Sequence, residues 1–452
     1  MAGRTGINSP MRLVKYVAVF IAILGACAAV SRADDAVGKP DTRLEDLEQM
    51  VKSLTSEIKQ MRAERAEDRR NQQKVQATIN AIQEDAETLR KSNWMELGEQ
   101  LKNFRFGGYG EMHANFGENG TADKFDFHRL VMYIGYDFTD WIHFHSEIEI
   151  EHAFVTDGAG GELVVEQAYM DFELDEAINI RAGRILTPLG IINEKHEPPS
   201  FFGVERPLFA KYIIPSTWSS DGIGIYGSPC KFLDYQLYVV GGLDGSGFSA
   251  TGGIRGGRIK ERPSMHEPAI TGRIDLHPFA GREMPLNQDL RLGLSTYHGG
   301  LDNGNSGSNP GINGHINIYS ADFEYTLCKF DFRGAVAYEN ISNASSMGTG
   351  TAEGIFGWYL EGGYHFMPDA WKKGKLAESD AVVFVRHDSV DTQFKMPGGV
   401  ARNPAGRQNE WTFGVNFYPT KNVVVKLDYQ VRSNGNDDDL DDLINFGLGW
   451  EF

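Results

Sequence analysis

The chain has 452 residues, a formal net charge of −18 at pH 7 and a mean hydropathy of −0.36. This acidic balance argues against a nucleic-acid partner, because proteins that bind nucleic acid present basic surfaces. Past residue 33 no apolar run approaches the roughly 20 residues that a membrane helix needs, so a membrane-spanning part would have to be a β-barrel, in which only alternate residues face lipid.

Residues 1–33 have the composition of a secretory signal peptide. Three basic residues precede an apolar run: Arg4, Arg12 and Lys15 stand before Tyr16–Val30. Small residues at Ser31 and Ala33 then predict cleavage before Asp34 and export of the chain. Retention of this run as a membrane anchor is the alternative. Leu24–Cys27 also loosely resembles a lipobox, which would lipidate Cys27.

Residues 34–101 predict a coiled coil. Apolar residues recur at alternating steps of three and four in one heptad frame: Leu44, Leu47, Val51, Leu54, Ile58, Met61, Val75, Ile79, Ile82, Ala86 and Leu89. Arg65, Asp68 and Gln72 keep the frame through its polar middle. Such a repeat is typical of coiled coils, and its helix would be about 70 Å long at about 1.5 Å per residue. A single helix folded onto the following domain is the alternative.

From residue 102 onward the hydrophobic period changes to two, which predicts β-strands. In Trp141–Glu151 apolar and polar faces alternate: Ile142, Phe144, Ile148 and Ile150 face one way, and His143, His145, Glu147, Glu149 and Glu151 face the other. We count sixteen such runs, although fourteen or eighteen would fit nearly as well. The last, Leu443–Phe452, places Ile444, Phe446, Leu448, Trp450 and Phe452 on one face and resembles the C-terminal strand of outer-membrane β-barrels. The predicted fold class is therefore all-β: a closed antiparallel transmembrane barrel over residues 102–452.

The predicted connectors alternate between short turns and long loops. The short ones are Thr139–Asp140, Asp175–Ala177, Cys328–Lys329 and Pro419–Asn422; the long ones are Pro188–Asp221, Leu243–Pro268, Gly299–Gly314 and Val390–Asn409. This is the plan of outer-membrane barrels, whose short turns face the periplasm. An even strand count places both termini, and the coiled coil, on the periplasmic side.

Pro188–Asp221 is the longest predicted connector and the third long loop. Its apolar residues are numerous: Ile191, Ile192, Phe201, Phe202, Leu208, Phe209, Ile213, Ile214 and Trp218. Loops of this length are usually functional or disordered, and this composition argues against disorder. We expect the loop to fold against other parts of the protein, either into the barrel or as an outer cap or latch onto a neighbouring subunit.

Several motifs resemble the phosphate-selective porin O and P family over about residues 104–452. They are Gly183–Arg184, Thr187–Gly190, Glu205–Pro207, Pro215–Ser219 with Gly222–Gly224, and Gly414–Pro419 with Asn422–Val424. The resemblance implies an outer-membrane porin, a homotrimer, a third loop that folds inward and narrows the channel, and phosphate or polyphosphate as solute.

The residues on the predicted inner face have mixed charge. From residue 102 onward there are 29 Lys and Arg against 47 Asp and Glu, and no uninterrupted arginine ladder is visible. Phosphate recognition uses arginine forks and lysine point charges. The candidate residues for the constriction or for solute binding are Lys195, Arg206, Lys211, Arg181, Arg184, Arg105, Arg129, Glu147 and Glu149. Many of these charges could simply pair across strands.

We therefore interpret the chain as a porin of the outer membrane of a Gram-negative-type bacterium, a water-filled channel for passive diffusion of ions and small hydrophilic solutes. The alternatives are an anion- or phosphate-selective channel, and a structural anchor whose coiled coil contacts peptidoglycan or another periplasmic partner. The partners we expect are membrane lipid and two further copies of the chain. No nucleophile, metalloprotease or phosphate-loop motif appears, and Cys230 and Cys328 are isolated. We expect no enzyme activity, no cofactor and no metal site.

Overall fold

The computed structural model describes residues 40–452, except 119–122, 153–160, 285, 303–311 and 437–439. The predicted signal peptide and Cys27 lie outside the described residues. The chain divides into two units, residues 1–100 and 101–452.

The first unit contains one continuous helix, α2 (Pro40–Leu101). The apolar heptad side chains described within it, from Leu47 to Ile82, are each 42–61% exposed in the single chain. A stripe of this kind is stable in water only when another surface covers it. Among the described residues, no helix combines the length and the apolar character that crossing a lipid bilayer requires.

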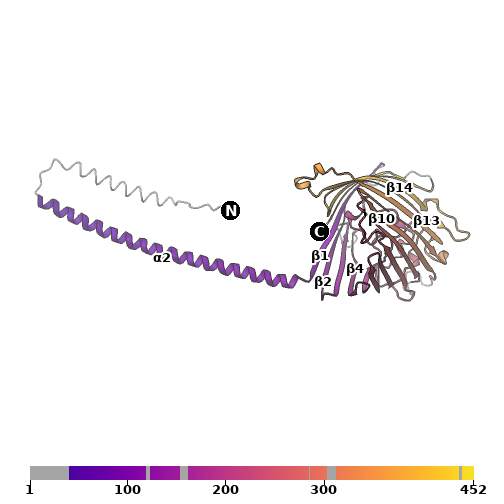
Figure 1. Cartoon of the computed structure of the whole chain (residues 1–452), viewed down its shortest axis with the longest axis horizontal. Helices are drawn as coiled ribbons and strands as arrows, with labels where there is room; N and C mark the ends of the chain where they lie inside the picture. Colours follow the sequence, from indigo (N-terminus) through magenta and orange to yellow (C-terminus); the bar gives the residue numbers. More distant parts are fainter. Residues whose placement is uncertain (1–39, 119–122, 153–160, 285, 303–311, 437–439) are drawn as a thin grey trace. The chain divides into compact units, whose positions relative to one another are not determined.

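The second unit is a closed antiparallel barrel of sixteen strands, as predicted (Figure 1). The strands are β1 (Phe104–Gly117), β2 (Lys124–Asp137), β3 (Ile142–Glu151), β4 (Glu162–Asp175), β5 (Ile178–Leu186), β6 (Ser219–Cys230), β7 (Leu233–Val240), β8 (Ala269–Leu276), β9 (Gln288–Gly300), β10 (His315–Leu327), β11 (Phe330–Ile341), β12 (Gly354–His365), β13 (Asp380–Lys395), β14 (Arg407–Thr420), β15 (Val423–Asn434) and β16 (Leu443–Glu451). Short helices lie in the connections: η1 (Pro198–Ser200), α3 (Phe209–Tyr212), η2 (Gly245–Gly247), η3 (Arg255–Gly257), η5 (Ala344–Ser346), η6 (Asp369–Trp371), η7 (Gly374–Leu376) and η8 (Pro404–Gly406).

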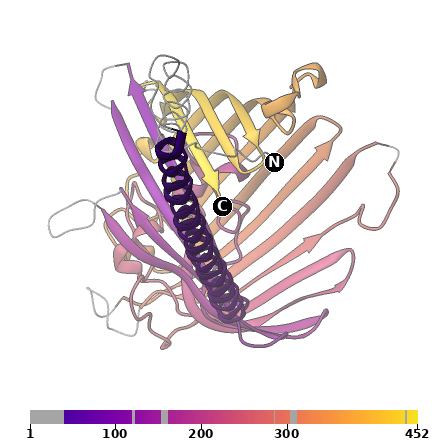
Figure 2. The ribbon, with the colours of Figure 1, turned by 90° about the vertical axis from the view of Figure 1, so that its left-hand side faces the viewer.

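The barrel closes between its first and last strands, β1 and β16, with Met112 opposite Leu448. In Figure 2 the purple strands that begin the barrel lie next to the yellow strands that end it. The amide of Phe452 donates to the carbonyl oxygen of Gly108 at 2.8 Å, and the amide of Gly108 donates back at 3.0 Å. Closure therefore leaves no free sheet edge at this seam.

The alternation predicted for the last strand is confirmed. Phe446 and Leu448 are 47% and 39% exposed on the outer face, whereas Asn445 between Ile444 and Phe446 is fully buried on the inner face. Large apolar side chains stand on the outside of most other strands as well, for example Leu237 on β7 and Phe413 on β14. This is the outer apolar band and polar interior expected of a barrel in lipid.

Two of the predicted loops have a boundary that is wrong by three or more residues. The loop predicted at Val390–Asn409 is residues 396–406, because β13 continues to Lys395 and β14 begins at Arg407. Residues 390–393 are all buried there, so the alternation of inner and outer residues is lost in the last part of β13, and its polar residues made the segment look like a loop. The loop predicted at Pro188–Asp221 is residues 187–218, hereafter L3, because β6 begins at Ser219.

Candidate functional site

L3 packs against the inner face of the barrel wall. Leu189, Ile213, Ile214 and Trp218 of the loop are at most 2% exposed and belong to one cluster with side chains of the wall, including Tyr297 of β9. The rings of Trp218 and Tyr297 lie 5.0 Å apart between centroids. The apolar composition of the loop, which predicted that it folds against something, is explained by this contact.

The first half of L3 is held to β8–β10 by ion pairs. The guanidinium of Arg273 on β8 donates to the carbonyl oxygen of Gly190 at 3.2 Å, and its Nε lies 3.3 Å from a carboxylate oxygen of Glu194. The same guanidinium pairs with Asp275 at 2.7 Å and with Asp322 at 2.8 Å. Because the Arg273 side chain is completely buried, its charge depends on these acidic partners.

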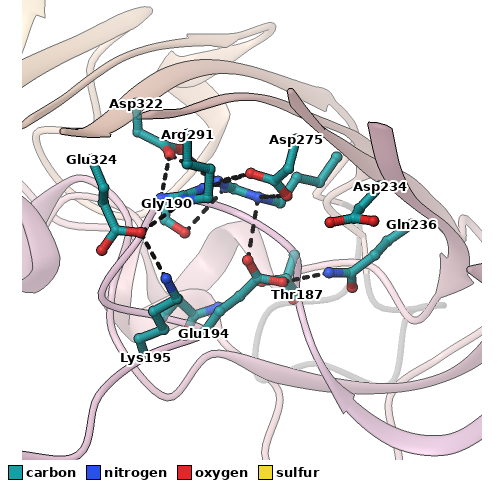
Figure 3. A network of polar contacts seen from close by, with 12 residues as sticks. Thr187, Gly190, Glu194, Lys195, Asp234, Gln236, Asp275, Arg291, Asp322 and Glu324 are labelled. Carbon is teal, nitrogen blue, oxygen red and sulfur yellow. Dashed lines mark hydrogen bonds and ion pairs between the residues drawn. The ribbon is translucent and has the colours of Figure 1, made fainter. Parts of the chain in front are cut away.

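Figure 3 shows how the neighbouring polar side chains converge on this part of the loop. The ammonium of Lys195 contacts Glu324 of β10 at 2.6 Å, and Gln236 of β7 donates to Glu194 at 2.7 Å. Arg291 of β9 shares the Glu324 carboxylate, at 2.7 Å. Burial raises the pKa of the Glu194 carboxyl, and the Arg273 guanidinium opposes that rise.

The middle of L3 reaches the opposite wall. Lys426 of β15 donates to the carbonyl oxygens of Phe201 and Gly203, each at 2.8 Å. The amide of Val204 donates to a carboxylate oxygen of Asp428 at 2.6 Å. Arg386 of β13 donates to the Glu205 carbonyl oxygen at 3.2 Å. L3 is therefore bonded to both sides of the barrel interior.

L3 also contacts the first strands. A carboxylate oxygen of Glu205 accepts from Asn115 of β1 at 3.0 Å and lies 3.4 Å from the His113 imidazole. Burial alone would raise the pKa of Glu205, but the hydrogen bond and charge of His113 hold it below its ordinary value. Nearby, Nε2 of His196 lies 3.1 Å from a carboxylate oxygen of Glu147 on β3.

Two water-accessible cavities lie at opposite ends of the barrel. The one at the long-loop end has a volume of about 420 Å³, and its charged lining residues are Asp123, Lys124, Glu205, Arg206, Lys211, Glu410 and Arg432. The one at the short-turn end has a volume of about 270 Å³, and its charged lining residues are Arg105, Asp137, Asp140, Asp171 and Glu173. The long-loop cavity has a balanced lining, whereas the short-turn cavity is acidic.

The structure separates the predicted site residues into groups. Lys195 pairs with Glu324, Arg181 with Asp171, Arg184 with Asp221, and Arg105 with Asp137; Arg129 pairs with Glu111 and with Glu149; Glu147 pairs with His196. Arg206 donates to Ser216 and to the His196 carbonyl oxygen inside L3. Lys211 is exposed at the long-loop cavity. Arg105 and Arg181 lie near the short-turn end, away from these two loop cations.

Sequence reasoning missed three residues that contact one another or the wall at this site: Glu166, His196 and Glu205. His196 and Glu205 are in the loop whose apolar residues drew attention, and only the fold shows what they contact. The sequence gives only a weak signal for Glu166. It and Asp171 are acidic residues of the same predicted strand, yet the period of two places them on opposite faces. That conflict is what a β-bulge produces.

No family model matches the sequence. The barrel has the fold of outer-membrane porins: OmpF of Salmonella typhi, solved in complex with daunomycin, aligns with a TM-score of 0.52 and 12% identity over 77% of this chain and 98% of OmpF. The outer-membrane channel DcaP of Acinetobacter baumannii aligns with a TM-score of 0.48 and 13% identity, over 77% and 97% of the two chains. The chain belongs to the same family as an uncharacterised protein of Aquifex aeolicus strain VF5, which is 33% identical over 369 residues, 78% of this chain and 80% of the relative.

Proposed function

We propose that the protein is an outer-membrane porin through which ions and small hydrophilic solutes diffuse passively. The observation that carries this proposal is a closed sixteen-stranded barrel with an apolar outer face, a polar inner face and water-accessible cavities at both ends. A barrel of this size encloses an aqueous lumen.

L3 narrows that lumen in the proposed channel. The loop is bonded to β8 through Arg273 and to β15 through Lys426, so it crosses the interior and cannot swing out without breaking buried hydrogen bonds. Lys211 and Arg206 then face solutes that enter from the long-loop side. Local charge at such a constriction biases which ions pass.

The pairing of wall arginines with carboxylates supports a weakly selective channel in preference to a phosphate-selective one. The arginines proposed for phosphate binding on the wall are committed to carboxylates, as Arg181 is to Asp171 by two hydrogen bonds of 2.7 and 2.8 Å. A paired guanidinium offers little net charge to a passing anion. With an acidic cavity at the short-turn end, we expect a modest preference for cations.

The exposed helix of the first unit extends this proposal. The exposed heptad stripe of α2 supports a homotrimer in which three helices cover one another, with the rod in the periplasm. The second candidate function, a structural anchor that reaches the cell wall through this rod, rests on the same exposed helix.

Single-channel recording in planar bilayers separates the two functions. The purified full-length protein should give stepwise currents with an approximately linear current–voltage relation. Under a salt gradient, the reversal potential should have the sign expected for a channel that prefers cations. Addition of inorganic phosphate should leave the chloride current unblocked. Absence of stepwise current would refute the porin function and leave the anchor.

A charge reversal tests the role of L3. Lys211→Glu should shift the reversal potential further toward cations, because Lys211 is exposed at the long-loop cavity. Lys421→Glu, in the turn between β14 and β15, is the matched control and should leave selectivity unchanged. Equal effects of the two substitutions would contradict a constriction formed by L3.

A further inference from the structure

A β-bulge in the barrel wall places an extra carboxylate beside L3. In the β3–β4 pairing Glu147 lies opposite Gln167 and Ile148 opposite Val165, so Glu166 is the unpaired extra residue. A bulge re-aims the side chain of the residue that it inserts. Here the Glu166 side chain is 2% exposed and lies beside Glu147 of β3 and His196 of L3.

The three side chains form a compact set of donor atoms. One donor atom from each residue lies within 4.8 Å of the other two. Nε2 of His196 is 3.1 Å from a Glu147 oxygen and 3.9 Å from a Glu166 oxygen. Donors around one tetrahedral zinc ion lie about 3–3.5 Å apart, given metal–ligand distances of about 2.0–2.2 Å. The 3.9 Å between Nε2 of His196 and the Glu166 oxygen exceeds this spacing, so the Glu166 carboxylate would have to move toward the other two donors to complete such a site.

Neighbouring groups hold two of these donors in the orientation that a metal ligand needs. Nδ1 of His196 lies 3.2 Å from the carbonyl oxygen of Asn193, a contact that assigns the proton to Nδ1 and directs the Nε2 lone pair toward the carboxylates. The second oxygen of Glu147 accepts a hydrogen bond from Gln167. Such outer contacts orient histidine and carboxylate ligands in metal sites.

Two buried polar atoms at the cluster lack a hydrogen-bond partner among the described residues. They are Oε2 of Glu166 and the hydroxyl of Tyr109, and the Tyr109 side chain is completely buried. The Tyr109 ring packs edge-on against the His196 ring, with 5.9 Å between centroids. A buried carboxylate oxygen without a hydrogen bond is costly unless a cation neutralises it. Protonation of His196 would satisfy Glu147 and still leave Oε2 of Glu166 without a hydrogen bond.

We propose that Glu147, Glu166 and His196 bind one divalent transition-metal ion, with Zn²⁺ as the chemical type, and that the ion clamps L3 to the β3–β4 wall. Two carboxylates and one neutral imidazole balance the charge of a divalent cation. Imidazole selects such metals over Ca²⁺ and Mg²⁺, which prefer all-oxygen sites. Glu166 also lines a cavity of about 90 Å³ at the loop end of β3 and β4.

Metal binding is tested on the purified full-length chain in detergent, stripped with a chelator and titrated with ZnCl₂ by calorimetry. We expect one zinc ion per chain, confirmed by elemental analysis after dialysis, and a zinc-dependent rise in the midpoint of thermal unfolding. Glu166→Gln and His196→Gln, which preserve side-chain size, should each weaken zinc binding by at least about 100-fold. Cobalt bound in place of zinc should give visible absorption bands that both variants lose.

His128→Gln is the matched control, because His128 belongs to a different cluster, with Asp126 and His152, at the loop end of β2 and β3. That variant should bind zinc as tightly as the unmodified chain. Failure of the unmodified chain to retain zinc would refute the site. Retention of zinc by both Glu166→Gln and His196→Gln, or its loss in His128→Gln alone, would also refute it.

Discussion

The ammonium of Lys426 lies 2.8 Å from the carbonyl oxygen of Phe201, a residue 225 positions earlier in the chain. The same ammonium lies 3.8 Å from the centre of the Phe201 ring, and the Lys426 side chain is almost completely buried. This contact joins the middle of L3 to the wall opposite its anchors on β8–β10. A loop bonded at one side only could move aside, whereas this one bridges the interior.

Lys426→Met should loosen that bridge. The substitution leaves the carbonyl oxygens of Phe201 and Gly203 without a donor, which costs about 1–3 kcal/mol for a buried group. We expect a higher single-channel conductance with more open-channel noise, together with a lower midpoint of thermal unfolding. Lys421→Met, at a turn, is the control and should change neither. Unaltered conductance and unfolding in Lys426→Met would show that the contact does not hold the loop.

Arg273→Met should destabilise the barrel. Arg273 is completely buried between Asp275, Asp322 and Glu194, so its removal leaves Glu194 without its paired cation and leaves Arg291 alone to neutralise Asp275 and Asp322. Breaking a buried ion pair in this way costs about 3–5 kcal/mol. In gel electrophoresis the folded barrel runs as a fast band. The temperature of sample heating at which this band disappears should fall. Arg282→Met, at an exposed position between β8 and β9, should leave that temperature unchanged. Similar behaviour of the two variants would contradict the proposed stabilising role.

The apolar heptad side chains of α2 are exposed in the single chain. We therefore expect assembly of the trimer to depend on this helix. Leu54 and Ile58 are 53% and 45% exposed in the single chain, and both lie in the heptad frame. The double substitution Leu54→Asp and Ile58→Asp should lower the trimer fraction in detergent, measured by light scattering after size exclusion. Lys52→Gln with Lys59→Gln, at flanking positions, provides a control with the same change in net charge. If both double variants stayed trimeric to the same extent, the barrels rather than the helices would hold the copies together.

The two free thiols of the described residues report the orientation of the barrel. Cys230 ends β6 and Cys328 lies in the turn between β10 and β11, and both are exposed at the short-turn end. A maleimide attached to a polymer too large for the channel should label neither thiol in intact cells, and both after the outer membrane is permeabilised. Ser345→Cys, in the loop between β11 and β12, should be labelled in intact cells. Labelling of Cys230 and Cys328 in intact cells would show that the short-turn end faces outward, and would contradict the proposed topology.

Strand number, closure and the position of L3 could all be predicted from periodicity and connector length. Strict alternation in residues 443–452 marked the inner and outer faces, and counting the remaining runs identified L3 as the third long loop. The apolar residues of L3 also indicated that it folds against other residues. The end of β13 was mispredicted, because the polar residues between Val390 and Lys395 resemble a loop when their partners are unknown.

Which charges meet could not be predicted. Lys195, Arg206 and Lys211 looked alike as loop cations, yet Lys195 is paired with Glu324 on β10 while Lys211 stays exposed at the long-loop cavity. Similarly, nothing in the residues around His196 indicated Glu147 or Glu166 as neighbours. Contacts between a long loop and a wall depend on the path of the loop through the lumen, which local periodicity does not encode.

The sequence by itself determined the architecture, because a barrel in lipid must alternate apolar and polar residues along every strand, and that period is legible without coordinates. Only the tertiary structure decided the chemistry of the interior. A single inserted residue at Glu166 shifts the parity of β4 and turns a carboxylate toward L3. The far wall meets the same loop through Lys426. Both relationships join residues far apart in the chain, and they form only when the barrel closes around L3.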